Sequence, residues 1–207
     1  MQTINVITPC SRPKNLRRMV DSIFKDCSFF HINWFVGVDT SKVKDFFVEA
    51  DIPNILYPNY GFFYDFKEDV NSVVGNAQRN VCLDRILNNK VFNGWCMFID
   101  DDNSVHPNFY WTFFNDLINN PFHRVFIYSQ DRKSDLMIIL NPKHVGVGYK
   151  LTDSSQFIVH SDVIGNIRWK VDDYNADGLF IQEIYNKNSV LSFLSDFIVS
   201  NRNSLKD

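Results

Sequence analysis

The stretch Gly94-Trp95-Cys96-Met97-Phe98-Ile99-Asp100-Asp101-Asp102-Asn103 joins an apolar run to three consecutive carboxylates. Its apolar half is short and follows a glycine, which is typical of a buried strand. Three adjacent carboxylates cannot lie inside a sheet, because burying an unpaired carboxylate costs several kcal/mol. We therefore expect the triplet to lie where the strand leaves the sheet. In open α/β sheets, ligands bind at the carboxyl ends of the strands.

The three carboxylates favour a metal site at this position. Clustered carboxylate oxygens suit Mg²⁺ or Mn²⁺, and these ions usually bind substrate phosphates as well. The working hypothesis is a metal–diphosphate site at residues 100–102. The alternative is an acidic turn that caps the next helix, since Asp and Asn favour such positions.

Composition restricts the class of protein. A chain of 207 residues and 24.3 kDa suits one domain, residues 1–207, that is large enough to bury a core. The net charge of -3 argues against nucleic acid as a partner. The sequence has no apolar run long enough to cross a bilayer and no signal peptide at its start, and the four cysteines lack metal-site spacing. These features predict buried, reduced thiols and a cytoplasmic location, and they leave open a peripheral association with a membrane or a place in a larger protein.

The first part of the chain has a strand–helix–strand pattern. Strands are predicted over residues 4–8 and 32–38, with a helix over 15–24 between them, so the two strands should be parallel. They end in Thr8 and Asp39, on the side where a ligand crevice should form. A third short strand is predicted over residues 55–58, and the aromatic stretch 59–66 has no clear periodicity.

A helix is predicted over residues 72–87, with Gln78 and Arg79 near its start. A helix N-terminus with an adjacent Arg can hold an anion. An ordinary helix with a solvated face explains this stretch equally well.

Beyond the triplet, the pattern alternates between helices and strands. It predicts a helix over residues 107–119, a hairpin of strands 124–129 and 136–140, a strand over 153–160, a helix over 179–185 capped by Asp177, and a final apolar run over 190–199. The fold class is therefore α/β, with a mixed, mostly parallel sheet flanked by helices in one domain.

These motifs together resemble those of nucleotide-sugar glycosyltransferases of the GT-A fold. The resemblance rests on Thr8-Pro9 and Arg12-Pro13 after the first strand, on Asp39 after the second, and on the acidic triplet. The pattern is similar to that of the proteoglycan glucuronyltransferases, which also have Gln-Arg-Asn at the start of a helix, as in residues 78–80. Compact viral and bacterial glycosyltransferases are similar in size. The resemblance covers the first half of the chain and depends on the order and spacing of the motifs.

The resemblance implies a Rossmann-like domain in which residues 1–105 bind the nucleotide sugar and residues 106–207 bind the acceptor. The donor would be a nucleoside-diphosphate sugar, UDP-sugar first, and the acceptor a hydroxyl of a glycan or glycoconjugate. The resemblance implies that Thr8, Pro9 and Arg12 line the nucleotide, that Asp39 lies near the base or ribose, and that Gln78 and Arg79 approach the diphosphate or sugar. It implies that Asp102 ligates Mn²⁺ or Mg²⁺ directly. Asp100 and Asp101 would face the sugar, the ribose or the waters of the metal, and Asp100 is also a candidate ligand.

A transferase that inverts configuration also needs a general base on the acceptor hydroxyl. Asp177 is the first candidate, since GT-A enzymes often place the base late in the chain, and Glu183 is the second. An N-cap role explains Asp177 equally well. The motif around the late Glu of the glucuronyltransferases has no copy here, so the base and the stereochemical outcome stay open. His160 could be a third metal ligand or an acceptor-site group, although a hydrogen-bonded histidine at a strand end is the simpler interpretation.

Two other functions remain as alternatives. A nucleotidyltransferase acting on a sugar phosphate also places carboxylates and Mg²⁺ beside a nucleotide, but residues 8–13 contain no glycine for its phosphate loop. A non-catalytic sugar- or metal-binding module would keep the triplet without turnover. The P-loop and the nucleophile elbow of serine hydrolases are both absent from the sequence.

Overall fold

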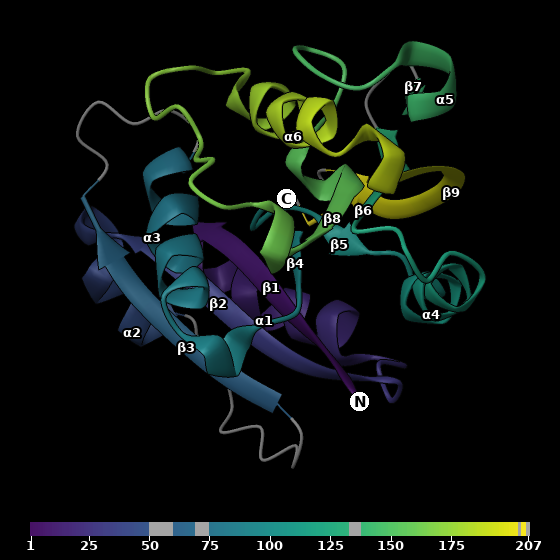
Figure 1. The fold of residues 1–207 in the computed structure, drawn as a ribbon. Helices are drawn as coiled ribbons and strands as arrows, with labels where there is room; N and C mark the ends of the chain where they lie inside the picture. Colours follow the sequence, from purple (N-terminus) through teal and green to yellow (C-terminus); the bar gives the residue numbers. More distant parts are fainter. Residues whose placement is uncertain (50–59, 69–74, 133–137, 203, 206–207) are drawn as a thin grey trace.

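The structure is a computed structural model, and it describes residues 1–49, 60–68, 75–132, 138–202 and 204–205. Helices and strands alternate along the chain (Figure 1). Their bounds are β1 Gln2–Cys10, α1 Pro13–Phe24, β2 Phe30–Asp39, α2 Val43–Glu49, β3 Tyr60–Lys67, α3 Asn76–Leu87, β4 Trp95–Phe98, β5 Ser104–Val105, α4 Phe109–Asn119, β6 Val125–Arg132, β7 Ile138–Leu140, α5 Pro142–Val145, β8 Phe157–His160, α6 Ala176–Lys187 and β9 Ser192–Arg202.

All the described strands belong to one sheet, with the order β3-β2-β1-β4-β8-β6-β9-β5 and with β7 paired to β6. The first four strands of this order are mutually parallel. β8 is antiparallel to both β4 and β6, whereas β6 and β9 are parallel. The predicted parallel pairing of the first two strands is confirmed, and so is the α/β fold class with a mixed sheet flanked by helices.

Helices cover both faces of the sheet and bury two hydrophobic clusters (Figure 1). Ile4 and Val6 of β1 face the cluster that contains the apolar side chains of α1 and α4. Ile7 faces the opposite cluster, with the apolar side chains of α3 and α6. A strand buried on both faces carries apolar side chains on both, here Ile4, Val6 and Ile7, while its buried polar residues Asn5 and Thr8 are hydrogen-bonded.

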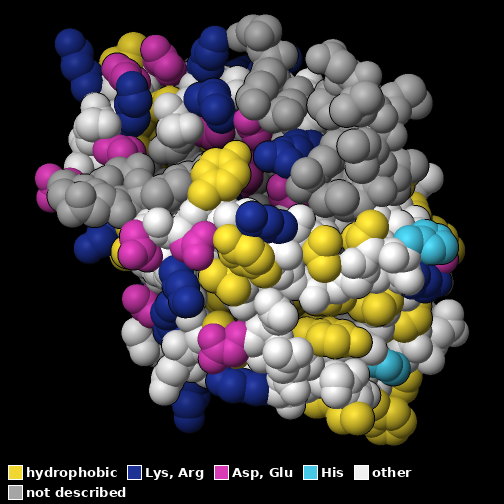
Figure 2. All heavy atoms as spheres, turned by 90° about the horizontal axis from the view of Figure 1, so that it is seen from above, with side chains coloured by type: hydrophobic (Ala, Val, Ile, Leu, Met, Phe, Trp, Pro, Cys, Tyr) yellow, Lys and Arg dark blue, Asp and Glu magenta, His cyan; other side chains and the backbone are white. Residues whose placement is uncertain are grey.

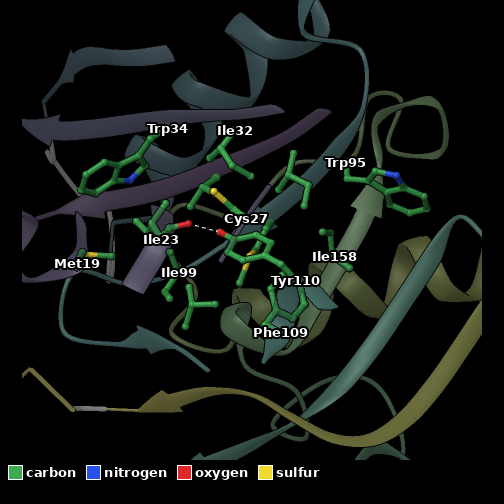
Figure 3. Packing of buried hydrophobic residues seen from close by; sticks show 14 of the residues in the cluster. Met19, Ile23, Cys27, Ile32, Trp34, Trp95, Ile99, Phe109, Tyr110 and Ile158 are labelled. Carbon is green, nitrogen blue, oxygen red and sulfur yellow. Dashed lines mark hydrogen bonds between the residues drawn. The ribbon is translucent and has the colours of Figure 1, made fainter. Parts of the chain in front are cut away.

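Aromatic side chains dominate the first cluster and account for much of the high Phe content. Figure 3 shows Tyr110 of α4 pointing toward α1, where its hydroxyl donates a hydrogen bond to the carbonyl of Ile23 at 2.5 Å. Phe109 and Phe113 stack on each other on the same helix, and Phe113 also packs edge-on against Trp95. The four cysteines are free and buried, as predicted.

The structure differs from the predicted elements in several places. The aromatic stretch without periodicity is strand β3, in which Phe63 stacks on Phe35 while Phe62 and Tyr64 are partly exposed on the other face. Alternate residues 62, 64 and 66 are aromatic on one face, and Phe63 stands among Gly61, Asp65 and Lys67 on the other, so Phe63 interrupts the apolar–polar alternation that marks a strand. The strand predicted over 55–58 and the first residues predicted for the helix over 72–87 lie outside the described residues.

Three further boundaries were wrong. β6 continues to Arg132, through part of the predicted hairpin turn, although the predicted antiparallel pairing with residues 138–140 is confirmed. The strand predicted over 153–160 begins at Phe157, because Asp153 caps the short 3-10 helix Ser154–Gln156. Asn175 is the N-cap of α6, so Asp177 lies in the first turn and does not cap it.

Among the described residues, no helix is both long enough and apolar enough to cross a membrane. Figure 2 shows the molecule from above, with acidic and basic side chains interspersed and hydrophobic side chains gathered in the lower half of the view. Over the described part of this face, neither sign of charge forms a broad continuous patch.

Candidate functional site

The acidic triplet lies at the carboxyl end of β4, beside the end of β1. The backbone N–H of Ile99 still bonds to the carbonyl of Ile7 at 3.0 Å, so the sheet ends immediately before the triplet. A turn follows, in which the N–H of Asn103 bonds to the carbonyl of Asp100 at 3.0 Å. The predicted position at the edge of the sheet is therefore correct, and the three carboxylates point to different partners.

Asp101 holds the turn that follows β1. One carboxylate oxygen accepts hydrogen bonds from the backbone N–H groups of Ser11 and Arg12, both at 2.6 Å, and from the Ser11 hydroxyl at 3.1 Å. The other oxygen accepts from Nη1 of Arg12 at 2.6 Å. Burial raises the pKa of Asp101, while these donors from Ser11 and Arg12 oppose the rise. Asp101 is buried and both of its oxygens are occupied within the protein, and its expected role toward the sugar, the ribose or the waters of a metal stays a prediction.

Arg12 is the most exposed member of this group, and it lies beside Asp102. Nη1 of Arg12 also lies 3.2 Å from Oδ2 of Asp102. The Arg12 side chain is 43% exposed, against 12% for that of Asp102. A guanidinium and a carboxylate are thus presented together at the sheet edge, where a charged ligand could reach both.

Arg79 of α3 lies beneath Asp100 and is only 1% exposed. Its Nη2 pairs with Oδ1 of Asp100, and its Nη1 donates to Asn76 at 2.9 Å and lies 3.9 Å from Oδ1 of Asp177. Burial acts to lower the pKa of Arg79, but the carboxylates of Asp100 and Asp177 outweigh it and raise the pKa. Arg79 therefore lies between two carboxylates as a buried cation, and its expected approach to the diphosphate or sugar stays a prediction.

Asp177 joins this group from the first turn of α6. Nε1 of Trp169 donates to its Oδ1 at 2.8 Å. Burial raises the pKa of Asp177 to about 6, with Arg79 opposing the rise and with Asp153 and Asp100 adding to it. A carboxyl with such a pKa is ionised at neutral pH and can still accept a proton, as a general base must.

Sequence reasoning missed the residues that hold this second half of the site. Asn76 donates to the carbonyls of Lys170 at 3.0 Å and Asp173 at 3.1 Å, so the start of α3 fixes the segment that leads into α6 (Figure 1). Ser154 Oγ donates to Oδ1 of Asp100 at 3.3 Å. The Asp-x-x-Gln capping box at residues 153–156 was a readable signal for that turn.

Three of the predicted nucleotide-binding residues pack inside the protein, and their role toward a nucleotide stays a prediction. Thr8 is fully buried and its hydroxyl accepts from Nε1 of Trp34 at 3.0 Å. Gln78 is also buried, and its amide donates to the carbonyl of Lys67 at 3.3 Å. Pro9 packs directly on Gly75, where an added Cβ would lie 2.5 Å from the Cβ of Pro9.

Asp39 ends β2 at the same edge of the sheet and is partly exposed. Its Oδ1 accepts from the N–H of Ser41 at 2.7 Å, which starts a turn of 3-10 helix. The carboxyl ends of β1, β2 and β4 thus carry Arg12, Asp39 and the triplet side by side, as the strand pattern predicted.

His160 and Glu183 are not brought to this group. His160 pairs with Trp95 at the start of β4, whereas the triplet follows the end of that strand. Its Nδ1 lies 3.1 Å from Oδ2 of Asp162, and burial lowers its pKa. Glu183 is exposed and pairs with Lys187 at 2.8 Å. The expectation that His160 completes a metal site with Asp102 is therefore not met in this structure.

The residues present fit a metal ion only in part. Within the described residues, no group of three or more His, Cys, Asp or Glu side chains is arranged to hold one. The carboxylates of Asp102 and Asp100 are oxygen ligands of the kind that Mg²⁺ and Mn²⁺ take. These ions are commonly bound by one or two carboxylates, with substrate phosphates and waters as the remaining ligands. The site fits an ion in that form, together with a phosphate-bearing ligand.

Neither protein-family models nor curated protein sequences match this chain. Solved structures do, and they show that the chain has a GT-A type fold. S. aureus TarS 1-349 in complex with UDP-GlcNAc is similar with a TM-score of 0.70 and 15% identity, over 96% of this chain and 58% of that one.

Two other similar structures contain Mn²⁺. The mannosyltransferase PcManGT from Pyrobaculum calidifontis, in complex with GDP-Man and Mn²⁺, has a TM-score of 0.65 and 11% identity, over 98% of this chain and 57% of that one. Glucosyl-3-phosphoglycerate synthase from Mycobacterium tuberculosis, in complex with Mn²⁺, UDP and phosphoglyceric acid, has a TM-score of 0.58 and 12% identity, over 97% and 70%. At these identities the likeness shows the fold, and this chain spans 58% and 57% of the TarS and PcManGT chains.

Proposed function

We propose that this chain is a metal-dependent glycosyltransferase that moves a sugar from a nucleoside-diphosphate sugar, UDP-sugar first, to a hydroxyl of a glycan. The observation that carries the proposal is the buried Arg79, which brings Asp100 of the triplet and Asp177 of α6 together at the carboxyl ends of the parallel strands. Fold likeness to glycosyltransferases crystallised with UDP, UDP-GlcNAc or GDP-Man supports this assignment.

The donor side of the site is Arg12, Asp39 and Asp102. Asp102, with Asp100 beside it, would hold Mn²⁺ or Mg²⁺, which would stabilise the charge that develops on the leaving diphosphate. Arg12 adds a cation with a flat donor edge suited to phosphate oxygens. Asp39 lies at the neighbouring strand end and would accept a hydrogen bond from the ribose or base.

The acceptor side is Asp177. It would remove the proton from the acceptor hydroxyl as that oxygen forms its bond to the anomeric carbon. The bond from this carbon to the diphosphate oxygen breaks, and its electron pair leaves with the diphosphate. Asp177 comes from the half of the chain assigned to the acceptor, residues 106–207, and the triplet from the donor half, residues 1–105. A base in this position favours single displacement, which inverts the anomeric carbon.

Calorimetric titration of UDP into the protein tests the donor site. We expect micromolar binding with Mn²⁺, loss of binding in EDTA, and loss in Asp102→Ala. Asp162→Ala is the matched control, since this exposed carboxylate lies beside His160 at the other end of β4. No binding of UDP or GDP under any condition would overturn the proposal.

The main alternatives, a nucleotidyltransferase and a non-catalytic binding module, are separated by the reaction itself. A glycosyltransferase releases UDP from its UDP-sugar, and Asp177→Asn should abolish acceptor-dependent release while leaving UDP affinity within about twofold. A binding module would bind the nucleotide with no release in either protein. A nucleotidyltransferase would instead release pyrophosphate from UTP and a sugar phosphate.

A further inference from the structure

If Arg12 served only to bind phosphate, it would not need to contact a carboxylate of the site. Its Nη1 pairs with the carboxylate proposed to hold the metal, at 3.2 Å from Oδ2 of Asp102. We propose that Arg12 is an exchangeable counter-ion, which neutralises Asp102 while the site is empty and turns to the diphosphate when a metal ion binds Asp102. This inference rests on the proposed function.

Asp101 anchors residues 11–12 through hydrogen bonds, as such an exchange requires. Three hydrogen bonds hold the backbone and hydroxyl of residues 11–12 to one oxygen of Asp101, and the fourth joins the other oxygen to Nη1 of Arg12 at 2.6 Å. The contact with Asp102 is longer, at 3.2 Å. The stronger set of contacts therefore stays with Asp101, and the contact with Asp102 is the one that can open. Asp101 is a positioning residue in this scheme.

Electrostatics gives the reason for a counter-ion. The Asp102 side chain is mostly buried, at 12% exposed, beside two other carboxylates of the same turn. A buried carboxylate is disfavoured unless cations or hydrogen-bond donors lie beside it, and Arg12 is one such cation. A metal ion supplies that charge when it binds, and the guanidinium is then free to pair with phosphate oxygens.

The exposure and the planar shape of the Arg12 side chain allow it to turn to the diphosphate. The Arg12 side chain is 43% exposed at the edge of the sheet, so a small rotation about the Asp101 contact keeps it within the site. The planar guanidinium can donate two parallel hydrogen bonds to phosphate, which the ammonium of a lysine cannot. Arg12 would therefore oppose the binding of free metal and favour the binding of metal with nucleotide.

The test measures these two affinities separately, in the full chain. Mn²⁺ binding without nucleotide is followed by electron paramagnetic resonance, and UDP binding at saturating Mn²⁺ by calorimetry. In Arg12→Gln we expect Mn²⁺ alone to bind about fivefold tighter or more, because a nearby positive charge is removed. We expect UDP with saturating Mn²⁺ to bind about tenfold weaker, since a charged hydrogen bond is lost.

Two further variants separate charge from shape and from global effects. Arg12→Lys keeps the charge and loses the flat donor edge, so Mn²⁺ affinity should stay within about twofold while UDP affinity falls. Lys25→Gln makes the same change of net charge at an exposed position at the far end of α1, and it should leave both affinities unchanged.

The outcomes distinguish this inference from the proposed function. If Asp102→Ala leaves the binding of Mn²⁺ and UDP unchanged, the diphosphate site itself is wrong. If Asp102 is required and Arg12→Gln weakens or does not change Mn²⁺ binding, the function stands and the exchange is overturned. A merely structural Arg12 would weaken both ligands together, and only the opposite changes support the proposal.

Discussion

Arg79 shows how one buried residue can organise a site built from distant segments. Its guanidinium lies between Asp100 and Asp177, which are far apart in sequence, and cation–π contact with Trp169 at 5.9 Å adds a third segment. A fully buried cation is stable only with such partners. The carboxylates in turn depend on it, because both are only partly exposed and would lose their counter-charge without it.

Replacement of Arg79 by Met should therefore destabilise the fold. The change leaves Asp100 and Asp177 without their counter-ion, and we expect a loss of about 3 kcal/mol in the free energy of unfolding near pH 7. Urea denaturation measures it. Arg79→Lys, which keeps the charge, should recover part of the loss. A value for Arg79→Met within 0.5 kcal/mol of wild type, roughly the range of an inert surface change, would contradict the assigned role.

Trp169 influences the pKa of Asp177 through a hydrogen bond. Burial raises the pKa of Asp177 to about 6, and the hydrogen bond from Trp169 acts to lower it. A general base must be ionised, so transfer activity should fall as the pH drops through about 6. Trp169→Phe removes the donor, so the pKa should rise further and the acid limb of the pH–rate profile should move to higher pH. A limb that stays in place, or moves to lower pH, would show that Asp177 is not the base.

At the scale of elements, the start of α3 depends on one glycine. Gly75 has a φ of 75°, and a Cβ there would lie 2.5 Å from the Cβ of Pro9 at the end of β1. This close approach lets the helix that carries Asn76 and Arg79 begin directly against the first strand. Local chain conformation and site geometry are therefore linked at this position.

Gly75→Ala should destabilise the protein by about 2–3 kcal/mol, from the left-handed backbone and the contact with Pro9 together. Gly165 is the matched control, because its φ is 56° but no atom lies within 4 Å of an added Cβ. Gly165→Ala should lose only the backbone contribution, about 1 kcal/mol. Equal losses in the two variants, measured by thermal unfolding, would mean that the contact with Pro9 is unimportant.

Local sequence patterns predicted the elements whose side chains are buried in a regular way. The apolar run before the triplet, the first parallel strands and the helix over 15–24 follow from periodicity and from burial on two faces. Strand β3 was missed because Phe63 interrupts the alternation of aromatic and polar residues along it. The insertion of β8 between β4 and β6 joins segments far apart in sequence, and no local pattern specifies such pairing.

The candidate site, like the fold, was predicted only in part. The triplet, Arg12 and Asp39 were placed correctly at the strand ends, because a charged run cannot continue inside a sheet. Their partners could not be predicted: Arg79 and Asp177 were both selected, but for separate roles, and only the fold brings them together. The role of Trp169 depends on a contact across eight residues of irregular chain, for which the sequence has no signal.

At the scale of the whole molecule, the proposed ligand should tie the two halves of the chain together. Arg12 and the triplet come from the half of the chain proposed to bind the donor and Asp177 from the half proposed to bind the acceptor, with Arg79 between Asp100 and Asp177. A ligand that binds only the folded state stabilises it by about 2.7 kcal/mol at 100 times its Kd. For a chain of this length, we expect UDP with Mn²⁺ to raise the Tm by about 5–10 °C. EDTA should abolish the shift, and so should Asp102→Ala, because the ion and its carboxylate act as a unit. A shift of the same size with UDP in EDTA would place the nucleotide on Arg12 without a metal, and a shift with Mn²⁺ alone would place the ion in a site complete without phosphate.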